Sequence, residues 1–134
     1  MATRGAALAK VLAAGPLAMA DPAAVPAGKY GEAALRRLGA WDAVAPRVVR
    51  AENVRAALAL VERGATPLGI VYATDARAGN GVAIVGAFPE SSHAPIRYPL
   101  ARLTASRHRD AEGFRRFLLS SAGRSILKLS LIHI

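Results

Sequence analysis

The chain has 134 residues, which is enough for one domain with a single core. It contains no cysteine, so disulfides and thiolate chemistry are excluded, and 18 Lys and Arg against nine Asp and Glu give a formal net charge of +9. The basic residues are scattered, with no RNA-binding aromatic signature or zinc-finger spacing, so we expect anionic partners but no nucleic acid.

An apolar run with basic residues opens the chain and ends in Ala18-Met19-Ala20, a pattern that signal peptides also show. Gly15-Pro16 interrupts this run. The alternative interpretation is a helix over residues 6–14 followed by a short buried strand over residues 17–20. We favour this alternative, which leaves no convincing signal peptide. Because no stretch of eighteen apolar residues exists, we expect no transmembrane helix.

Strand and helix patterns then alternate along the chain. A helix is predicted over residues 26–38, and a second begins at Glu52 or Asn53 and ends at Gly64. A short helical turn with Thr74 as its cap is predicted over 74–78, and helices over 110–119 and 121–129 close the chain. Strands are predicted over 47–50, 68–73, 82–88 and 96–103. This order predicts an α/β layered fold, with a mostly parallel sheet flanked by helices.

Motifs of catalysis and cofactor binding are scarce. The sequence has no phosphate-binding glycine loop, no dinucleotide fingerprint and no His/Asp/Glu cluster with metal-ligand spacing, so we expect no cofactor and no metal. Ser92 and His93, beside Glu90, suggest a small hydrolase as a minor alternative. Sequence neighbours rarely form a catalytic triad, and no G-x-S-x-G elbow is present, so we expect no enzymatic activity.

Two helix starts and one tyrosine follow predicted strands. Pro26, Ala27 and Gly28 offer no capping side chain at the start of the first helix, and Val54 lies at the start of the second. Tyr72 lies near the carboxyl end of the next strand. Because the carboxyl ends of parallel strands share one edge of a sheet, these groups are expected to meet there. Free N–H groups at helix N-termini suit an oxyanion, whereas water caps and ordinary core packing are the alternative interpretation.

Three segments carry a resemblance to a known family. LAMADPAAVPAGKYGEAALRRLGAW, RAENVRAALALVERGATPLGIVYATDA and FPESSHAPIRYP, in this order, resemble the periplasmic molybdate-binding proteins of ABC importers. The similarity covers residues 17–119. It implies one lobe of a type II periplasmic-binding protein, with molybdate or tungstate bound by the backbone N–H groups of Ala27 and Val54 and by the Tyr72 hydroxyl. It also implies a periplasmic location and a membrane permease as partner.

The resemblance implies a division of the chain into three parts. Residues 1–16 are expected to be a helical remnant of a first lobe, residues 17–103 the second, ligand-binding lobe, and residues 104–134 the C-terminal helices that return to the first lobe. The tail over residues 127–134 departs from the family pattern. Most of the first lobe, with its hydroxyl-bearing ligand loops, is absent from the sequence, so we expect a fragment that binds molybdate weakly or undetectably.

Two further expectations follow. Phe114, Phe117 and Leu118 are expected to form an exposed apolar patch that favours self-association. An oxyanion-sensing effector domain of a regulator is the alternative to a transport protein, although the sequence shows no helix-turn-helix pattern.

Overall fold

The computed structural model describes residues 2–129 and divides into two compact units, Met1–Ala94 and Pro95–Ile134. The first unit contains a parallel sheet of three strands, β1 (Leu17–Ala20), β2 (Val48–Ala51) and β3 (Leu68–Ile70), in the order β2-β1-β3. Leu17 of the central strand lies opposite Val48 on one side and Leu68 on the other. The predicted α/β class and parallel pairing are confirmed.

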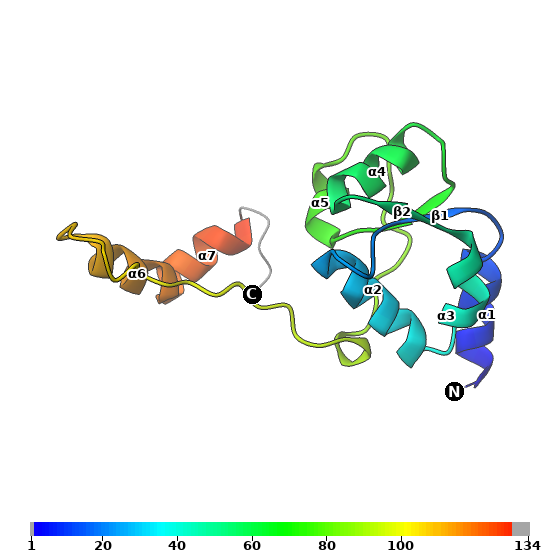
Figure 1. Ribbon diagram of the computed structural model, residues 1–134, viewed down its shortest axis with the longest axis horizontal. Coiled ribbons are helices and arrows are strands. Elements are labelled where there is room, and N and C mark those ends of the chain that lie inside the picture. Colours follow the sequence, from blue (N-terminus) through cyan, green and yellow to red (C-terminus); the bar gives the residue numbers. More distant parts are fainter. Residues whose placement is uncertain (1, 130–134) are drawn as a thin grey trace. The chain divides into compact units, whose positions relative to one another are not determined.

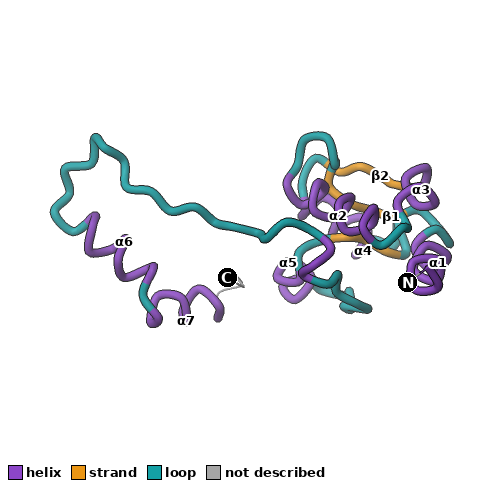
Figure 2. Tube along the Cα trace, turned by 90° about the horizontal axis from the view of Figure 1, so that it is seen from below, coloured by secondary structure: helices purple, strands orange, loops and turns teal. Residues whose placement is uncertain are grey.

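Helices cover both faces of this sheet (Figures 1 and 2). The chain runs through α1 (Ala2–Leu12) before β1, and through α2 (Pro26–Arg37), α3 (Trp41–Val44) and the 3-10 turn η1 (Ala45–Arg47) between β1 and β2. It then forms α4 (Val54–Glu62) between β2 and β3, and α5 (Ala73–Ala78) after β3. Helices α1, α2 and α3 lie on one face and α4 and α5 on the other, which makes a layered α/β unit.

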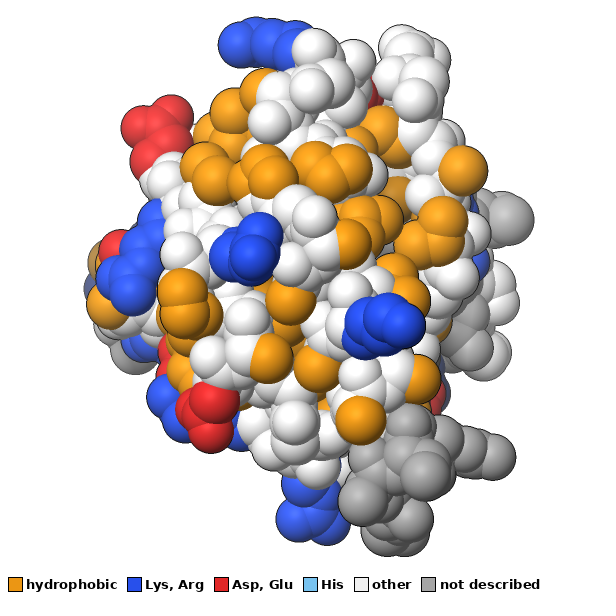
Figure 3. All heavy atoms as spheres, turned by 90° about the vertical axis from the view of Figure 1, so that its right-hand side faces the viewer, with side chains coloured by type: hydrophobic (Ala, Val, Ile, Leu, Met, Phe, Trp, Pro, Cys, Tyr) orange, Lys and Arg blue, Asp and Glu red, His pale blue; other side chains and the backbone are white. Residues whose placement is uncertain are grey.

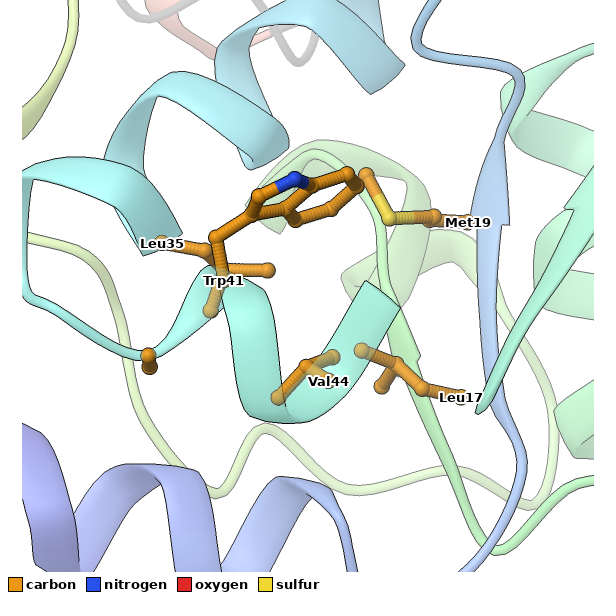
Figure 4. Close-up of a cluster of buried hydrophobic side chains, with 6 residues drawn as sticks. Leu17, Met19, Leu35, Trp41 and Val44 are labelled. Atoms are coloured by element: carbon orange, nitrogen blue, oxygen red, sulfur yellow. The ribbon is translucent and has the colours of Figure 1, made fainter. Parts of the chain in front are cut away.

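The main core lies between the sheet and α2 and α3 (Figure 4). Side chains of a strand alternate between its two faces, so Leu17 and Met19 point to the same side. Both are fully buried, and they pack with Leu35 of α2 and with Trp41 and Val44 of α3. Burying a large apolar side chain contributes about 1.5–3 kcal/mol. This cluster therefore holds α2 firmly against the centre of the sheet.

The opposite face of the sheet packs against α4 through small side chains. Ala18 of β1, Ala51 of β2 and Ala57 of α4 form this second cluster, with Leu60 and Val61 packed around it. A glycine in the left-handed region ends each of the two main helices, Gly39 (φ 72°) after α2 and Gly64 (φ 71°) after α4.

Two of the predicted strands do not form. Residues 82–88 and 96–103 are irregular, and Ile84 and Val85 are 48% and 85% exposed. Both segments have apolar residues suited to a strand, but a strand also needs a neighbour to pair with its backbone. Within residues 2–129 the sheet contains only β1, β2 and β3, and neither segment pairs with it.

The predicted part over residues 1–16 includes α1, which packs within the first unit. Leu8 and Leu12 contact the main core, and Gly5 lies so close to Leu38 that a β-carbon would overlap its carbonyl oxygen. The boundary between the two units falls after Ala94, earlier than the predicted boundary at 103. The assignment of residues 1–16 to a first lobe stays a prediction.

The second unit contains α6 (Ala111–Leu119) and α7 (Ser121–Leu129), joined at Ser120. The hydroxyl of Ser120 donates to the carbonyl of Phe117 (2.6 Å) and accepts from the amide of Gly123 (3.2 Å). A β-carbon on Gly123 would lie 2.8 Å from the Leu118 Cα, so glycine allows the two helices to meet closely. The tail over residues 127–134, predicted to depart from the family pattern, consists mainly of residues 130–134, which lie outside the described residues.

The predicted apolar patch is exposed on α6. Phe114 is 63% exposed and Phe117 is 44% exposed, whereas Leu118 is half-buried. None of the helices within residues 2–129 combines the length and the apolar character that crossing a membrane requires.

Candidate functional site

Three neighbouring strands end at one edge of the sheet, and each continues into a predicted site residue. Strand β1 leads to the entrance of α2 with Ala27, β2 leads to the entrance of α4 with Val54, and β3 leads to Tyr72. The amide of Asp21 donates to the carbonyl of Ala51 (2.9 Å), which holds the ends of β1 and β2 together. Because all three strands are parallel, the topology brings the three predicted residues to the same edge.

The entrance of α2 leaves two backbone donors open. Val25 is the N-cap with an extended backbone (φ −103°, ψ 132°) and provides no side-chain cap, and Pro26 has no N–H. Among the described residues, no acceptor binds the amides of Ala27 and Gly28, while the next amide, of Lys29, donates to the carbonyl of Val25 (3.0 Å). Both residues are buried, and neither carries a side chain larger than a methyl group that could cover the amides.

The entrance of α4 has one capped donor and two open ones. The helix was expected to begin at Glu52 or Asn53; it begins at Val54, and Asn53 is its N-cap, with Oδ1 accepting from the amide of Ala56 (2.9 Å). The amide of Ala57 donates to the carbonyl of Asn53 (3.1 Å). The first two amides of α4, those of Val54 and Arg55, bind no acceptor within residues 2–129. Each main helix thus presents a pair of amides at the same edge.

Asp21 organises the loop between β1 and α2, a role that was not predicted from the sequence. Its carboxylate accepts from the amide of Ala23 (3.1 Å), and its carbonyl accepts from the amide of Val25 (2.8 Å). The carboxylate also lies 3.6 Å from the guanidinium of Arg50 in β2. An aspartate that binds an amide two residues later is a common turn signal, so the Asp-Pro pair indicated this loop.

Gly28 has a packing role that the sequence did not reveal. A β-carbon at this position would overlap the carbonyl oxygen of Ala20 and lie 2.7 Å from the backbone of Asp21 and Pro22. These are backbone atoms of the buried strand and its loop, and they cannot rotate away as a side chain would. Glycine therefore lets the first turn of α2 lie directly against the end of β1.

Tyr72 lies where β3 ends and is the N-cap of α5 (φ −68°, ψ 146°). Its carbonyl accepts from the amide of Ala76 (3.1 Å), and the residue is half-buried. The prediction that Thr74 caps this helix is wrong, because α5 begins at Ala73 and Thr74 is already inside its first turn. The extended backbone that a cap requires belongs to Tyr72 instead.

The Ser92–His93 pair does not form a nucleophile and its base. Ser92 is 5% exposed, and its hydroxyl donates to the carbonyl of Pro89 (2.5 Å). His93 Nδ1 is 2.8 Å from the carbonyl oxygen of Ala94. The hydrolase alternative therefore lacks the Ser–His hydrogen bond that activates such a nucleophile.

Within the described part of the chain, no group of three or more His, Cys, Asp or Glu side chains could hold a metal ion. On the face shown in Figure 3, Lys and Arg side chains stand singly between apolar and other side chains. That face has no continuous basic stripe of the kind that binds nucleic acid.

Comparison with known proteins places the chain in a family. Residues 3–129 match the model of the bacterial extracellular solute-binding proteins. The chain is 46% identical over 118 residues to the molybdate-binding protein ModA of Escherichia coli, an alignment that covers 88% of this chain and 46% of that protein. It is 45% identical over 111 residues to the molybdate-binding protein ModA of Haemophilus influenzae, covering 83% of this chain and 44% of that protein.

A more distant relative carries a related name. A putative ABC transporter substrate-binding lipoprotein, YvgL of Bacillus subtilis, is 36% identical over 113 residues, covering 84% of this chain and 44% of that protein. The chain spans about half the length of these curated relatives, because the alignments cover 44–46% of them. The family match extends over nearly the whole chain. The chain therefore belongs to the bacterial extracellular solute-binding protein family.

Proposed function

We propose that this chain supplies one lobe of the periplasmic substrate-binding component of an ABC importer for molybdate or tungstate. The two relatives with 45–46% identity are named molybdate-binding proteins, and the third is named an ABC transporter substrate-binding lipoprotein. A family of solute-binding proteins fits a role in capture and delivery, to a membrane permease, without catalysis.

One observation supports this proposal most strongly. Two helices, α2 and α4, present open amide pairs at one sheet edge, where Tyr72 also lies. Helix N-termini carry a partial positive charge and directed N–H donors, which together favour an anion. In this proposal the amides of Ala27 and Val54 and the hydroxyl of Tyr72 donate to oxygens of a tetrahedral dianion.

A site of this kind selects its ligand by protonation. The backbone N–H groups can only donate, and the phenol is proposed to donate as well, so the ligand oxygens that they bind must accept. Phosphate near neutral pH carries one or two protons on every molecule, and each such O–H would face another donor. This mismatch disfavours phosphate relative to fully deprotonated molybdate.

The lobe is expected to bind molybdate weakly by itself. The resemblance implies further donors from a first lobe, and the relatives are about twice as long as this chain. Each hydrogen bond to a charged group contributes roughly 1.5–3 kcal/mol, so about four missing bonds remove ~6–12 kcal/mol. That loss is on the order of four to nine decades of affinity. Isothermal titration that gives a micromolar dissociation constant for this chain contradicts the expectation that this lobe supplies only part of the ligand's donors.

Substitution of Tyr72 tests the assignment of its hydroxyl. We expect Tyr72→Phe to weaken molybdate binding by about 1.5–3 kcal/mol, because one donor to a charged ligand is lost. Amide NMR titration suits the measurement, since it determines dissociation constants in the millimolar range. Tyr98→Phe is the matched control, because Tyr98 is 53% exposed and lies in the second unit. Equal dissociation constants for Tyr72→Phe and the wild type remove this hydroxyl from the site.

We also propose that the apolar surface of α6 promotes self-association. Phe114 and Phe117 are both exposed on this helix. Size-exclusion chromatography is expected to show a concentration-dependent dimer or larger species that Phe114→Ser reduces. A clean monomer at high concentration contradicts this part of the proposal.

A further inference from the structure

The segment from Phe88 to His93, near the end of the first unit, packs against the rest of that unit at several points. Phe88 packs on the main core, and Glu90–Ser92 forms a 3-10 turn, η2, that contacts α2. Within this turn the amide of Ser92 (2.9 Å) and its hydroxyl (2.5 Å) both donate to the carbonyl of Pro89. These two hydrogen bonds stabilise the turn from which His93 extends.

His93 reaches α2 through its ring. The centres of the His93 and Tyr30 rings are 5.8 Å apart, with the ring planes inclined by 60°. This separation and tilt are typical of attractive aromatic pairs. The carbonyl of Ala94 accepts a hydrogen bond from His93 Nδ1 (2.8 Å), so Nδ1 carries the proton and the ring is held in one orientation.

Tyr30 lies one helical turn after Ala27 and on the same face of α2. The entrance of α2 has no side-chain cap, so other contacts must hold its amides in place. Gly28 rests against the backbone of Ala20, which blocks movement toward the sheet. The contact between Tyr30 and His93 is a second contact on α2, and it comes from the segment that follows η2.

We propose that Tyr30 and His93 form a clasp that positions the open amides of Ala27 and Gly28 at the entrance of α2. Neither side chain needs to touch the ligand, so both are positioning residues. The effect on ligand affinity rests on the proposed function, because it requires that these amides bind an anion. The effect on the first turn of α2 does not.

The experiment compares His93→Ala, which removes the ring, with His93→Phe, which retains a ring for Tyr30. Hydrogen exchange of the Lys29 amide, bonded to the Val25 carbonyl (3.0 Å), reports on the first turn of α2. The Ala57 amide, bonded to the Asn53 carbonyl (3.1 Å), is the internal control in α4.

We expect His93→Ala to accelerate exchange at Lys29 but not at Ala57, and to weaken molybdate binding about two- to tenfold, the range measured for aromatic pairs. His93→Phe restores both properties. His108→Ala is the matched control, because the His108 side chain is 74% exposed in the second unit, and it leaves both unchanged.

The clasp is overturned if the Lys29 amide of His93→Ala exchanges at the wild-type rate. It is also overturned if His93→Phe does not restore the wild-type exchange rate at Lys29. If exchange changes as expected but affinity does not, the clasp does not position the binding amides and the inference is wrong. If the wild-type chain binds no molybdate, the proposed function fails, and exchange at Lys29 alone decides whether the clasp holds α2.

Discussion

Replacing Val54 by proline removes one proposed donor and leaves the helix intact. Val54 is the first residue of α4, and its amide binds no acceptor in the described structure. Proline is favoured at this helix position, where the missing N–H breaks no hydrogen bond. The preceding residue, Asn53, is extended (φ −156°, ψ 173°), as a residue before proline prefers. We therefore expect the free energy of unfolding to change by less than about 0.5 kcal/mol.

The effect on binding is expected to be much larger. One hydrogen bond from a backbone amide to a charged oxygen contributes about 1.5–3 kcal/mol, which corresponds to a roughly ten- to hundredfold weaker dissociation constant for Val54→Pro. The assay is a titration with sodium molybdate that follows the amide NMR signals of the chain. Val54→Ala is the matched control, because it shortens the side chain and keeps the N–H. A folded Val54→Pro variant that binds molybdate as tightly as Val54→Ala refutes the role of this amide.

Two other predictions concern packing and pH. Gly28→Ala is expected to lower the free energy of unfolding by about 1–3 kcal/mol, because the added β-carbon would overlap the carbonyl of Ala20. Urea denaturation measures this change. Gly113→Ala is the control that should not be destabilised, because a β-carbon there would meet nothing within 4 Å. Hydrogen bonds from the side chains of Arg115 and Arg116 lower the pKa of Glu112 from 4.5 to about 2. Because the folded pKa is below the unfolded one, this stabilisation of α6 is complete above pH 4.5 and is lost as the pH falls toward 2. A carboxyl-carbon NMR titration with a midpoint near 4.5 contradicts that shift.

The sequence predicted the elements whose signals are local. The short strand over residues 17–20 was predicted correctly, the helix over residues 54–62 was predicted from apolar periodicity and the glycine that ends it, and the alternation of strands and helices predicted the parallel sheet. The strands over residues 82–88 and 96–103 were predicted wrongly, because a periodic pattern describes the faces of a strand but not whether a partner strand is present.

The arrangement at the sheet edge was predictable for the same reason that the sheet was. Parallel strands place their following loops at one edge, so Ala27, Val54 and Tyr72 were expected together from element order. The packing of Gly28 on Ala20 and the contact of Tyr30 with His93 were not predictable. Each depends on side chains or backbone brought together by the tertiary fold, and residues 30 and 93 are separated by most of the first unit.

The most direct measurement records the backbone amide NMR signals of the chain while molybdate is added at constant pH and ionic strength. The proposed site predicts progressive, saturable shifts of the Ala27, Gly28, Val54 and Arg55 amides, whereas the amides of α6 and α7 stay unchanged. Phosphate at the same concentrations is expected to cause smaller shifts. If the amides at the two helix entrances do not move, or if shifts appear only elsewhere, these helix N-termini do not form half of an oxyanion site.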